Sequence, residues 1–482
     1  MAILAELPNP NLKKAIMLKR EGPTHFILRG QRLGQIVQND GAPRRPKELV
    51  AYDLWNLRKE GEWWLFDANM PEEIASRGYK MAVSGGPVIA QTLDTLMGVF
   101  EVGGQSAALA TAGGSEFPYH VFCPCDDIGP VGMAGIQSAV STAEISPMRE
   151  RTVAALVADT FIRWNMQDRR AQPLWYVRTE TDSSVSPIAL QQGRALNNIK
   201  VAVNNWLEAA KTYQVEPFLA AVILDIAGDD LYSSAEAYLE NMLLLLSRLG
   251  DDVFDGKLSR PAPVVTVFDV GSQRNLRPEI IAAQWTLSLF HGAHHYCVAA
   301  PGYMFEVRSD GWLTDQGRRH KAEMIAAALS YEAIQKPSQM LNEIDESWGC
   351  PTPLLAEHVN NTIRVTFRSM SNLIIDESDP FDAGSKKGFQ VIKASGAAGP
   401  KIIEVAICED DPCAIELILD RAPEAGSKLA YACANTEDRA RTYPSNCGSI
   451  RDDWSMISSD GSNLYRWALP CYLPIGGMSD EL

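Results

Sequence analysis

Short apolar runs alternate with helical patterns along the middle of this chain, and that alternation constrains the fold more than any other feature. Residues 218–224 are apolar throughout, as expected of a strand that is covered on both faces of a sheet. Before them, the apolar residues from Leu196 to Leu207 are spaced by three and four positions, which places them on one face of a helix. Strands that alternate with helices predict an α/β fold, in which helices cover both faces of a parallel sheet.

A serine follows the first strand of this region and is the first candidate for a catalytic residue. Residues 99–106 read Val-Phe-Glu-Val-Gly-Gly-Gln-Ser, an apolar run that ends in two glycines and Ser106. Glycines allow a sharp turn after a strand, and α/β proteins present a nucleophilic serine to a crevice from such a turn. Taken alone, the run is equally compatible with an ordinary loop serine.

The remaining strands and helices of this region are expected in the order that a parallel sheet requires. Such sheets bind ligands at the carboxyl ends of their strands, where polar loops follow in this sequence. One of these loops is residues 179–184, and residues 111–148, rich in glycine and proline, are expected to form an irregular excursion above the crevice. The expected strands are residues 174–177, 218–224, 264–270 and 295–299, and the expected helices include residues 235–249, 280–290 and a last helix that Thr314 or Asp315 caps.

Two segments rich in β structure flank the α/β region. Residues 1–94 contain short mixed runs and three tryptophans (Trp55, Trp63 and Trp64), which we expect to pack this arm onto the next domain rather than to dock sugars. Residues 336–482 contain short apolar runs separated by Gly, Pro and Asp, a texture typical of a β-sandwich or jelly roll. The chain is therefore expected to have three parts, residues 1–94, 95–335 and 336–482.

Charge and composition exclude several classes of partner. The formal charge is −16, and no cluster of Lys and Arg is present that could track a phosphate backbone or an anionic membrane. The first ten residues lack the features of a signal peptide, and no apolar run is long enough to span a bilayer, so we expect a product made in a cytoplasm. Nine cysteines, an odd number, are interpreted as mostly buried free thiols.

Metal sites are considered and set aside. Residues 123–125 (Cys-Pro-Cys) have no second pair at the spacing of a zinc site. His291, His294 and His295 have no assigned carboxylate partner, and packed or edge histidines are the simpler reading. The acidic residues near positions 229–230 and 252–255 lack the spacing of a known cation loop. We expect neither a metal nor another cofactor.

Four blocks in a fixed order resemble the SGNH hydrolases, in particular the sialate O-acetylesterase-like branch found in phage and prophage proteins. Gly-Gln-Ser at residues 104–106 is similar to the nucleophile block of that branch. Asp229-Asp230 with the apolar helix after it is similar to the third block, and residues 309–317 are similar to the last block, Asp-Gly-x-His-Leu-Thr-x-x-Gly. Residues 448–467 are similar to the C-terminal β domain of such phage proteins. Each block is weak alone, and four in order are more specific.

The resemblance implies a flavodoxin-like (SGNH) α/β domain that hydrolyses acetyl esters on carbohydrate. In that reaction a serine attacks the acetyl carbonyl, a histidine takes its proton, an aspartate orients the histidine, and N–H groups hold the oxyanion. Ser106 matches the nucleophile and Asp310 matches the orienting acid. The candidates implied for oxyanion or substrate binding are Gln105, Ser183, Gly228 and Asp229.

The sequence departs from the family pattern at the catalytic base. The family's histidine stands three residues after the aspartate, where this sequence has Leu313. His320 and His120 are the substitutes we consider, although His320 is also explained as a surface histidine in the basic run 318–321. The family's amide-bearing glutamine corresponds to Ile226, which has no side-chain donor. A serine without a base is a poor nucleophile.

These observations favour a bacteriophage virion structural protein, tail-associated or capsid-decorating, built on an SGNH domain that has lost activity. Its expected partners are other virion proteins or further copies of itself in a symmetric oligomer, and a host surface glycan that it binds without cleavage. The alternative is an active carbohydrate O-acetylesterase of a tail fibre or spike, which requires a base within reach of Ser106. A third hypothesis, a lectin-like module, would be marked by exposed tryptophans beside the crevice.

Overall fold

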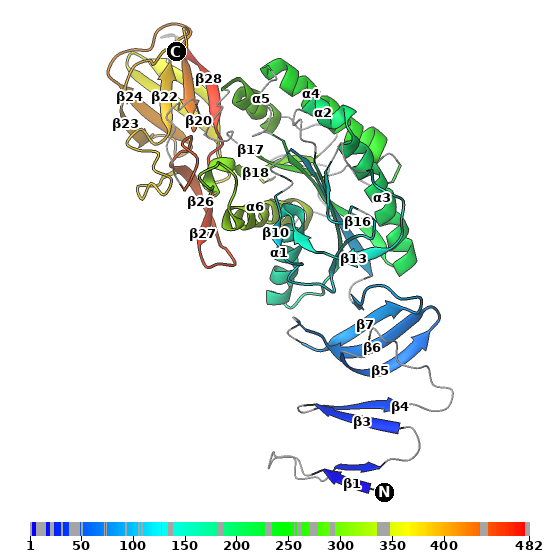
Figure 1. The fold of residues 1–482 in the computed structure, drawn as a ribbon. Coiled ribbons are helices and arrows are strands. Elements are labelled where there is room, and N and C mark those ends of the chain that lie inside the picture. The colour runs from blue at the N-terminus through cyan, green and yellow to red at the C-terminus, as the bar shows by residue number, and fades with distance from the viewer. Residues whose placement is uncertain are drawn as a thin grey trace.

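The chain folds into three parts that follow one another from the N-terminal arm to the C-terminal β domain (Figure 1). The computed structural model describes residues 2–5, 16–19, 24–29, 32–37, 49, 52–71, 73, 75–91, 94–104, 107, 109–126, 128–133, 138–181, 187–226, 234–254, 256–257, 263–268, 278–289, 295–334, 348–433 and 442–477.

The middle part is a mainly parallel sheet, which confirms the expected fold class. Its strands follow the order β13-β11-β15-β9-β16-β17-β18, and β12 pairs with β15; within this path only β13 is antiparallel to its neighbour. The bounds are β9 (Thr95–Gly103), β11 (Val121–Pro124), β12 (Val131–Met133), β13 (Ile145–Pro147), β15 (Leu174–Thr181), β16 (Glu216–Asp225), β17 (Pro263–Phe268) and β18 (His295–Pro301).

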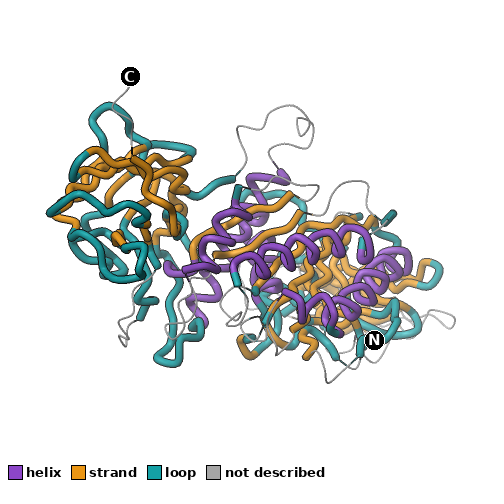
Figure 2. The backbone as a smooth tube through the Cα atoms, turned by 90° about the horizontal axis from the view of Figure 1, so that it is seen from above, coloured by secondary structure: helices purple, strands orange, loops and turns teal. Residues whose placement is uncertain are grey.

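Helices cover both faces of this sheet (Figure 2), because apolar side chains alternate between the two faces of the central strands. Val99 and Ile223 face α1 and α6, which pack against each other, whereas Phe100 and Val222 face α3 and α4. Thr314 caps α6, since its hydroxyl accepts the N–H of Gly317 at 3.0 Å. The helices are α1 (Val153–Gln167), α2 (Pro187–Gln192), α3 (Arg194–Tyr213), α4 (Ala235–Arg248), α5 (Pro278–Ser288) and α6 (Asp315–Ile334), with a π-helical turn at Leu249–Val253 and a 3-10 turn at Gly302–Met304.

The strand order reverses at β9, and the carboxyl end of that strand is where sheets of this kind form their crevice. β15 pairs with one side of β9, and β16, which follows β15 in the chain, pairs with the other side. The neighbouring strands β15, β9, β16, β17 and β18 are therefore the second, first, third, fourth and fifth parallel strands of the central sheet in chain order, which is the flavodoxin-like arrangement. Sheets of this kind bind ligands where the order reverses, beyond the carboxyl ends of the strands. In this chain that point lies between Gly103 and Asp225, which are paired in register.

Two segments differ from the sequence-based expectation. The excursion at residues 111–148 is not irregular throughout, because β11 joins the main sheet and its residues Val121, Phe122 and Cys123 are fully buried. The glycines and prolines around that short apolar run obscured it. The short strands β10 (Thr111–Ala112) and β14 (Glu150–Arg151) pair with each other outside the main sheet.

The N-terminal part is a series of antiparallel sheets. Its four-stranded sheet packs on α3: the ring of Trp63 lies 5.5 Å from that of Tyr213, and Lys80 Nζ donates to the Tyr213 carbonyl at 2.7 Å. The packing onto the next domain is therefore confirmed for Trp63, whereas Trp64 is buried in the separate core of the arm and Trp55 is partly exposed. The strands are β1 (Ala2–Ala5), β2 (Ile16–Lys19), β3 (Thr24–Arg29), β4 (Arg32–Val37), β5 (Asp53–Glu60), β6 (Trp63–Asn69), β7 (Arg77–Ala82) and β8 (Ile89–Ala90).

The C-terminal part is the expected β domain. A seven-stranded sheet, in the order β22-β25-β28-β19-β20-β24-β23, curls nearly into a barrel because its two edge strands contact each other, and a three-stranded sheet (β21-β26-β27) completes the domain. The strands are β19 (Thr352–Val359), β20 (Thr362–Arg368), β21 (Ile374–Ile375), β22 (Phe389–Ile392), β23 (Ile402–Ile407), β24 (Ala414–Leu419), β25 (Lys428–Tyr431), β26 (Ile450–Ile457), β27 (Asn463–Trp467) and β28 (Cys471–Gly477).

The C-terminal domain shares one hydrophobic core with the α/β domain. Tyr303 donates its hydroxyl to the Ala468 carbonyl at 2.7 Å, and the indole of Trp348 donates to the Ala299 carbonyl at 3.2 Å. The boundary expected at residue 335 lies outside the described residues. All nine cysteines are free thiols and six are buried, as expected.

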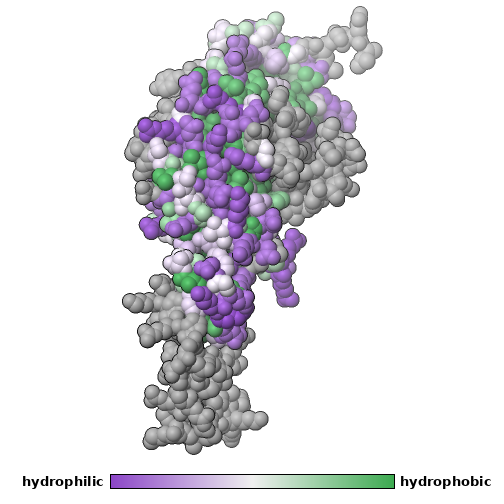
Figure 3. Space-filling view, turned by 90° about the vertical axis from the view of Figure 1, so that its right-hand side faces the viewer, coloured by the Kyte–Doolittle hydropathy of each residue, from purple (hydrophilic) through white to green (hydrophobic). Residues whose placement is uncertain are grey.

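The surface is mixed in character on the face that Figure 3 shows. There the described residues are mostly hydrophilic, with small hydrophobic spots between them, so this face carries no broad apolar patch among the residues described. Within the described part of the chain, no helix combines the length and the apolar character needed to cross a membrane.

Candidate functional site: the crevice at the end of β9

The turn after β9 is packed directly onto the end of β16. The Gly104 N–H donates to the Asp225 carbonyl at 3.0 Å, and the Ala107 N–H donates to the Gly104 carbonyl at 3.2 Å. A Cβ atom on Gly103 would lie 2.3 Å from the Asp225 carbonyl oxygen and 2.8 Å from the Cβ of Ala107. Glycine is therefore needed at position 103 for the two strands to approach. Ser106 and Gln105 themselves lie outside the described residues.

We expect Gly103→Ala to lower the free energy of unfolding by about 1–3 kcal/mol, because the added methyl group must displace backbone atoms of β16. Urea denaturation followed by circular dichroism measures the change. Gly476→Ala is the matched control, since a Cβ at that position in β28 would come no closer than 3.9 Å to another atom, the Ala356 carbonyl oxygen. Equal losses in the two variants would contradict the close contact at Gly103.

Three charged side chains are buried beneath this turn, on the face that α1 and α6 cover. Lys321 Nζ of α6 lies 2.8 Å from Asp225 Oδ1. Glu101 of β9 accepts hydrogen bonds on Oε2 from the Thr179 hydroxyl (2.9 Å) and the Ala154 N–H (3.3 Å), whereas Oε1 has no hydrogen-bond partner among the residues that the structure describes. Burial, and next the charge of Asp225, raise the pKa of Glu101 to about 7, and Lys321 opposes this rise.

Sequence reasoning missed this group. The signal was present as Glu101, a carboxylate in the middle of an otherwise apolar strand. A charge in a strand that is covered on both faces has to be paired or protonated, so it marks a special environment.

The polar loop expected at residues 179–184 is partly strand. β15 extends to Thr181, and Thr179, Glu180 and Thr181 are buried. Burial is possible because each side chain has a partner: Thr179 donates to Glu101, Glu180 accepts from Arg178 and Asn198, and Thr181 donates to the Gly132 carbonyl. Ser183, the binding candidate of this loop, lies outside the described residues.

A second buried ionic group lies on the opposite face of the sheet, which α3 covers. Arg178 is fully buried and donates through Nε to Glu180 Oε1 at 2.7 Å and through Nη1 to both oxygens of Asp126, at 3.2 and 3.3 Å. The same Nη1 donates to the Gly129 carbonyl. Asn198 of α3 donates to the other oxygen of Glu180 at 3.0 Å. This group fixes the segment after β11 to the end of β15.

Asp310, the expected orienting acid, is exposed at the surface. Its carboxylate accepts two hydrogen bonds from the guanidinium of Arg308, at 3.2 and 2.9 Å, and one from the Trp312 N–H at 3.2 Å. Asp310 therefore makes its contacts within its own loop, and the structure does not bring it to His320.

His320 is bonded to the C-terminal domain. Its Nε2 lies 2.9 Å from Asp460 Oδ2 and 3.2 Å from Ser462 Oγ, on the loop between β26 and β27. Desolvation alone would raise the pKa of Asp460, but hydrogen bonds from Ser462 and His320 hold it below the usual range. His320 is 7% exposed, so the reading of a surface histidine is wrong: Asp460, 140 positions later in the chain, covers it.

His120, the other substitute base, lies at the amino ends of the strands, whereas the turn after β9 lies at their carboxyl ends. His120 directly precedes β11. The first residue of β11 pairs with Trp175 of β15, and Trp175 pairs with Met97 near the start of β9. Gly103 lies six residues further along β9, which is about 20 Å for a strand. His120 contacts Arg77 and Glu73 there, with its Nε2 3.0 Å from Arg77 Nη1.

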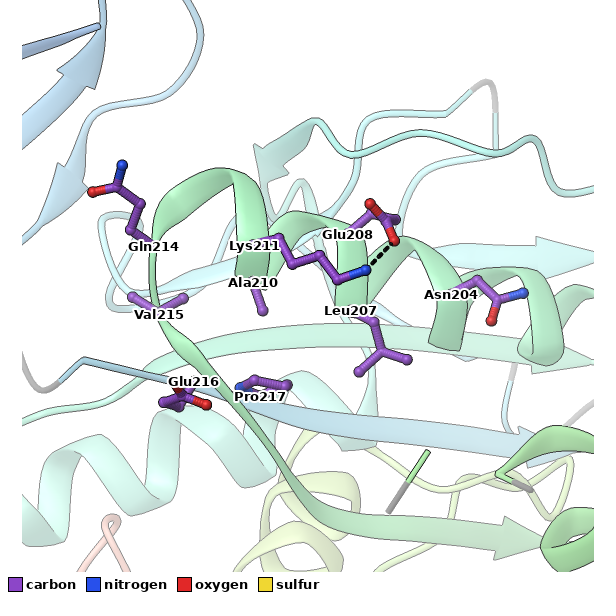
Figure 4. Close-up of a pocket in the computed structure, with 9 residues that line it drawn as sticks. All are labelled: Asn204, Leu207, Glu208, Ala210, Lys211, Gln214, Val215, Glu216 and Pro217. Carbon is purple, nitrogen blue, oxygen red and sulfur yellow. Dashed lines mark hydrogen bonds and ion pairs between the residues drawn. The ribbon is translucent and has the colours of Figure 1, made fainter. Parts of the chain in front are cut away.

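Other expected residues are placed only in part. Gly228, Asp229, Asp230, Asp255, His291 and His294 lie outside the described residues, and His295 begins β18 at the amino edge of the sheet. A pocket with a volume of about 680 Å³ lies at that same edge, where α3 ends and β16 begins. Figure 4 draws the residues that line it, among them Lys211 and Glu208, which are hydrogen-bonded at 2.6 Å. This pocket is therefore separate from the crevice at the carboxyl ends of the strands.

Comparisons with known proteins find likeness of fold only. No family model matches the sequence, and no curated protein matches it. A carbohydrate acetylesterase from Xanthomonas citri superposes with a TM-score of 0.47 at 12% identity, covering 85% of this chain and 86% of that chain. A protein from Arabidopsis thaliana gives a TM-score of 0.33 at 16% identity, covering 48% of this chain and 97% of that chain. Scores and identities at this level assign neither a family nor an activity.

Proposed function

We propose that this chain is a structural component of a bacteriophage virion, tail-associated or capsid-decorating, whose SGNH-like domain binds surface glycan and does not hydrolyse esters. The virion location rests on the resemblance of residues 448–467 to the C-terminal domain of phage proteins. Its partners in the proposal are other virion proteins or further copies of this chain.

The proposed loss of activity is based on where the described histidines lie. Among the described histidines of the α/β domain, His120 and His295 lie at the amino edge of the sheet, away from Gly103, and the Nε2 of His320 is bonded to Asp460 and Ser462. A serine hydroxyl needs a base to take its proton as it attacks, and general bases contribute about 10²–10⁴-fold to such reactions.

The second candidate function is an active carbohydrate O-acetylesterase that uses Ser106. One observation favours it: the turn that leads to Ser106 stands where the strand order reverses, and close packing on Asp225 fixes it there. That is the position from which α/β hydrolases present a nucleophile.

Hydrolysis of p-nitrophenyl acetate separates the two candidates. We expect the wild-type protein and Ser106→Ala to release p-nitrophenol at equal, background rates, because in this proposal none of the described histidines activates the serine. Ser378→Ala, which removes an exposed hydroxyl in the C-terminal domain, is the matched control. A rate that falls by about a hundredfold or more in Ser106→Ala alone would replace the first candidate by the second.

A second measurement tests the virion location. Proteomic analysis of purified particles, after a high-salt wash, is expected to retain this chain at a constant ratio to the major capsid or tail proteins. Loss of the chain in the wash would contradict a structural role.

A further inference from the structure

A turn of the C-terminal domain is hydrogen-bonded to α6 of the α/β domain. The turn consists of residues 458–462, which join β26 to β27, and Figure 1 shows this hairpin reaching to α6. Asp460 Oδ2 accepts the side-chain N–H of Gln316 at 3.0 Å and lies 2.9 Å from His320 Nε2. One carboxylate of the turn therefore binds two side chains of α6.

A second bond fixes the turn further along α6. The Ser459 N–H donates to Glu323 Oε1 at 3.0 Å. Gln316, His320 and Glu323 are four and three positions apart, so they share one face of the helix. His320 is 7% exposed and Glu323 is 1% exposed, so this face is shielded from water. We call the bonds between residues 458–462 and these three side chains the hairpin contact.

The bonds within the turn determine which ring nitrogen of His320 carries a hydrogen. Ser462 Oγ lies 3.2 Å from His320 Nε2 and donates its own hydrogen to Asp460 Oδ1 at 2.6 Å. Both neighbours of Nε2, the Ser462 oxygen and the Asp460 carboxylate, are therefore acceptors, so Nε2 carries a hydrogen whether the ring is neutral or charged. The additional proton of the charged ring is then on Nδ1. Protonation keeps the bonds of Nε2 and adds a positive charge to their donor.

The acceptor of this bond is ionised throughout the range in which histidines change charge. Desolvation acts to raise the pKa of Asp460, but hydrogen bonds from Ser462 and His320 hold that pKa below its usual range. Histidine changes charge between about pH 5 and pH 8. A hydrogen bond between two charged groups is roughly twice as strong as one between neutral groups. The hairpin contact is therefore stronger on the acidic side of this range.

Several other charged or titratable groups lie near the hairpin contact. Among the residues that the structure describes, Asp460 is the only charged group hydrogen-bonded to the imidazole. Arg163 of α1 has its own partner, Glu116, at 2.7 Å. Lys321 is likewise paired with Asp225, at 2.8 Å. The described groups near the contact are Arg163 on α1, Arg319, Lys321 and Glu323 on α6, and Glu306 and Tyr443 in the segments near Asp460.

We propose that the hairpin contact is a pH-sensitive link between the two domains, which protonation of His320 strengthens and loss of that proton weakens. The link extends to the floor of the crevice, because Lys321, the next residue of α6, pairs with Asp225 at the end of β16. The inference is independent of the proposed function, since it requires neither a glycan nor an ester.

Hydrogen–deuterium exchange of the full chain, measured by mass spectrometry, tests this link. The bond to Glu323 protects the Ser459 N–H, so peptides that contain residues 458–462 report the opening of the hairpin contact. After correction for the intrinsic pH dependence of exchange, we expect protection of this turn to fall about five- to tenfold between pH 5.5 and pH 8.

Two variants identify the group that titrates. His320→Gln keeps a side-chain N–H but cannot gain a charge, so we expect its turn to show the same low protection at both pH values. Asp460→Asn, at a partly exposed position, removes the charged acceptor and is also expected to remove the pH dependence. Residues 393–399, a turn of the same domain held by backbone bonds and without a histidine, are the internal control for changes in global stability.

Equal protection of residues 458–462 at pH 5.5 and pH 8 in the wild-type protein would overturn the proposal. A pH dependence that His320→Gln retains would overturn it as well, and loss of that dependence in Glu323→Gln would then assign the titration to Glu323. Circular dichroism verifies that each variant is folded. If His320→Gln did not fold, a pH dependence that Asp460→Asn retains would overturn the proposal in its place.

Discussion

Replacement of Arg178 by methionine is expected to lower the free energy of unfolding by about 3–5 kcal/mol. Arg178 and the two carboxylates it bridges, Glu180 and Asp126, are all shielded from water. Methionine fills much of the same volume but donates no hydrogen bond, so both carboxylates would remain buried without their cation. Burial already raises the pKa of Glu180 against the effect of Arg178, and loss of the guanidinium would raise it further.

Urea denaturation at pH 7 measures the loss, and two variants serve as controls. Arg178→Lys keeps the charge but cannot reach both carboxylates with a planar fork, so we expect a smaller loss than in Arg178→Met. Arg308→Met breaks the exposed pair with Asp310 and is expected to leave the unfolding midpoint nearly unchanged. If Arg178→Met and Arg308→Met denatured at the same urea concentration, the buried group would contribute nothing to stability.

The central strands and helices were predictable because their burial leaves a simple pattern. β16 is buried along most of its length, and residues 218–224 are accordingly apolar without a break. α3 is buried on one side only, and its apolar residues from Leu196 to Leu207 recur every three or four positions. In both elements the local sequence carries the whole signal.

The buried charged groups were not predictable, because each depends on a partner far away in the sequence. Thr179 and Glu180 read as loop residues, and their burial requires Glu101 and Asn198. The run 318–321 reads as a solvated basic surface, yet Arg318, His320 and Lys321 are buried. Their partners come from other segments, as in the pairs of Lys321 with Asp225 and of His320 with Asp460.

The candidate site was also predictable only in part, because some of its contacts are made with distant parts of the chain. The motif that ends in Ser106 predicts the position of a nucleophile turn, and the structure places Gly103 and Gly104 at the reversal of strand order. Short motifs do not predict what a neighbouring histidine contacts. His320 follows the last motif closely, but the loop between β26 and β27 binds it.

The remaining large effect concerns pH. Glu101 has a pKa of about 7 in the folded protein, against 4.5 for an ordinary glutamate. Between these values the folded chain holds a proton that the unfolded chain has lost, so the folded state loses stability as the pH rises. Below a pH of 4.5, Glu101 is protonated in both the folded and the unfolded chain, so its ionisation does not lower the free energy of unfolding. Above a pH of about 7, its buried ionised form lowers the free energy of unfolding by about 3 kcal/mol.

Glu101→Gln is therefore expected to stabilise the protein at alkaline pH relative to the wild type. The amide keeps an oxygen that can accept from Thr179 and Ala154, and it cannot ionise beside Asp225. We expect the difference in unfolding free energy, variant minus wild type, to increase by about 2–3 kcal/mol between pH 5 and pH 8. Urea denaturation at the two pH values measures it.

Glu404→Gln is the control for the loss of one negative charge, because Glu404 is exposed on the edge strand β23. The difference in unfolding free energy between Glu404→Gln and the wild type is expected to be the same at pH 5 and pH 8. If Glu101→Gln behaved in the same way, Glu101 would be ionised beside Lys321 throughout this range. The floor of the crevice would then carry a permanent negative charge, whereas a protonated Glu101 leaves the neutral pair of Asp225 and Lys321 beneath the turn that leads to Ser106.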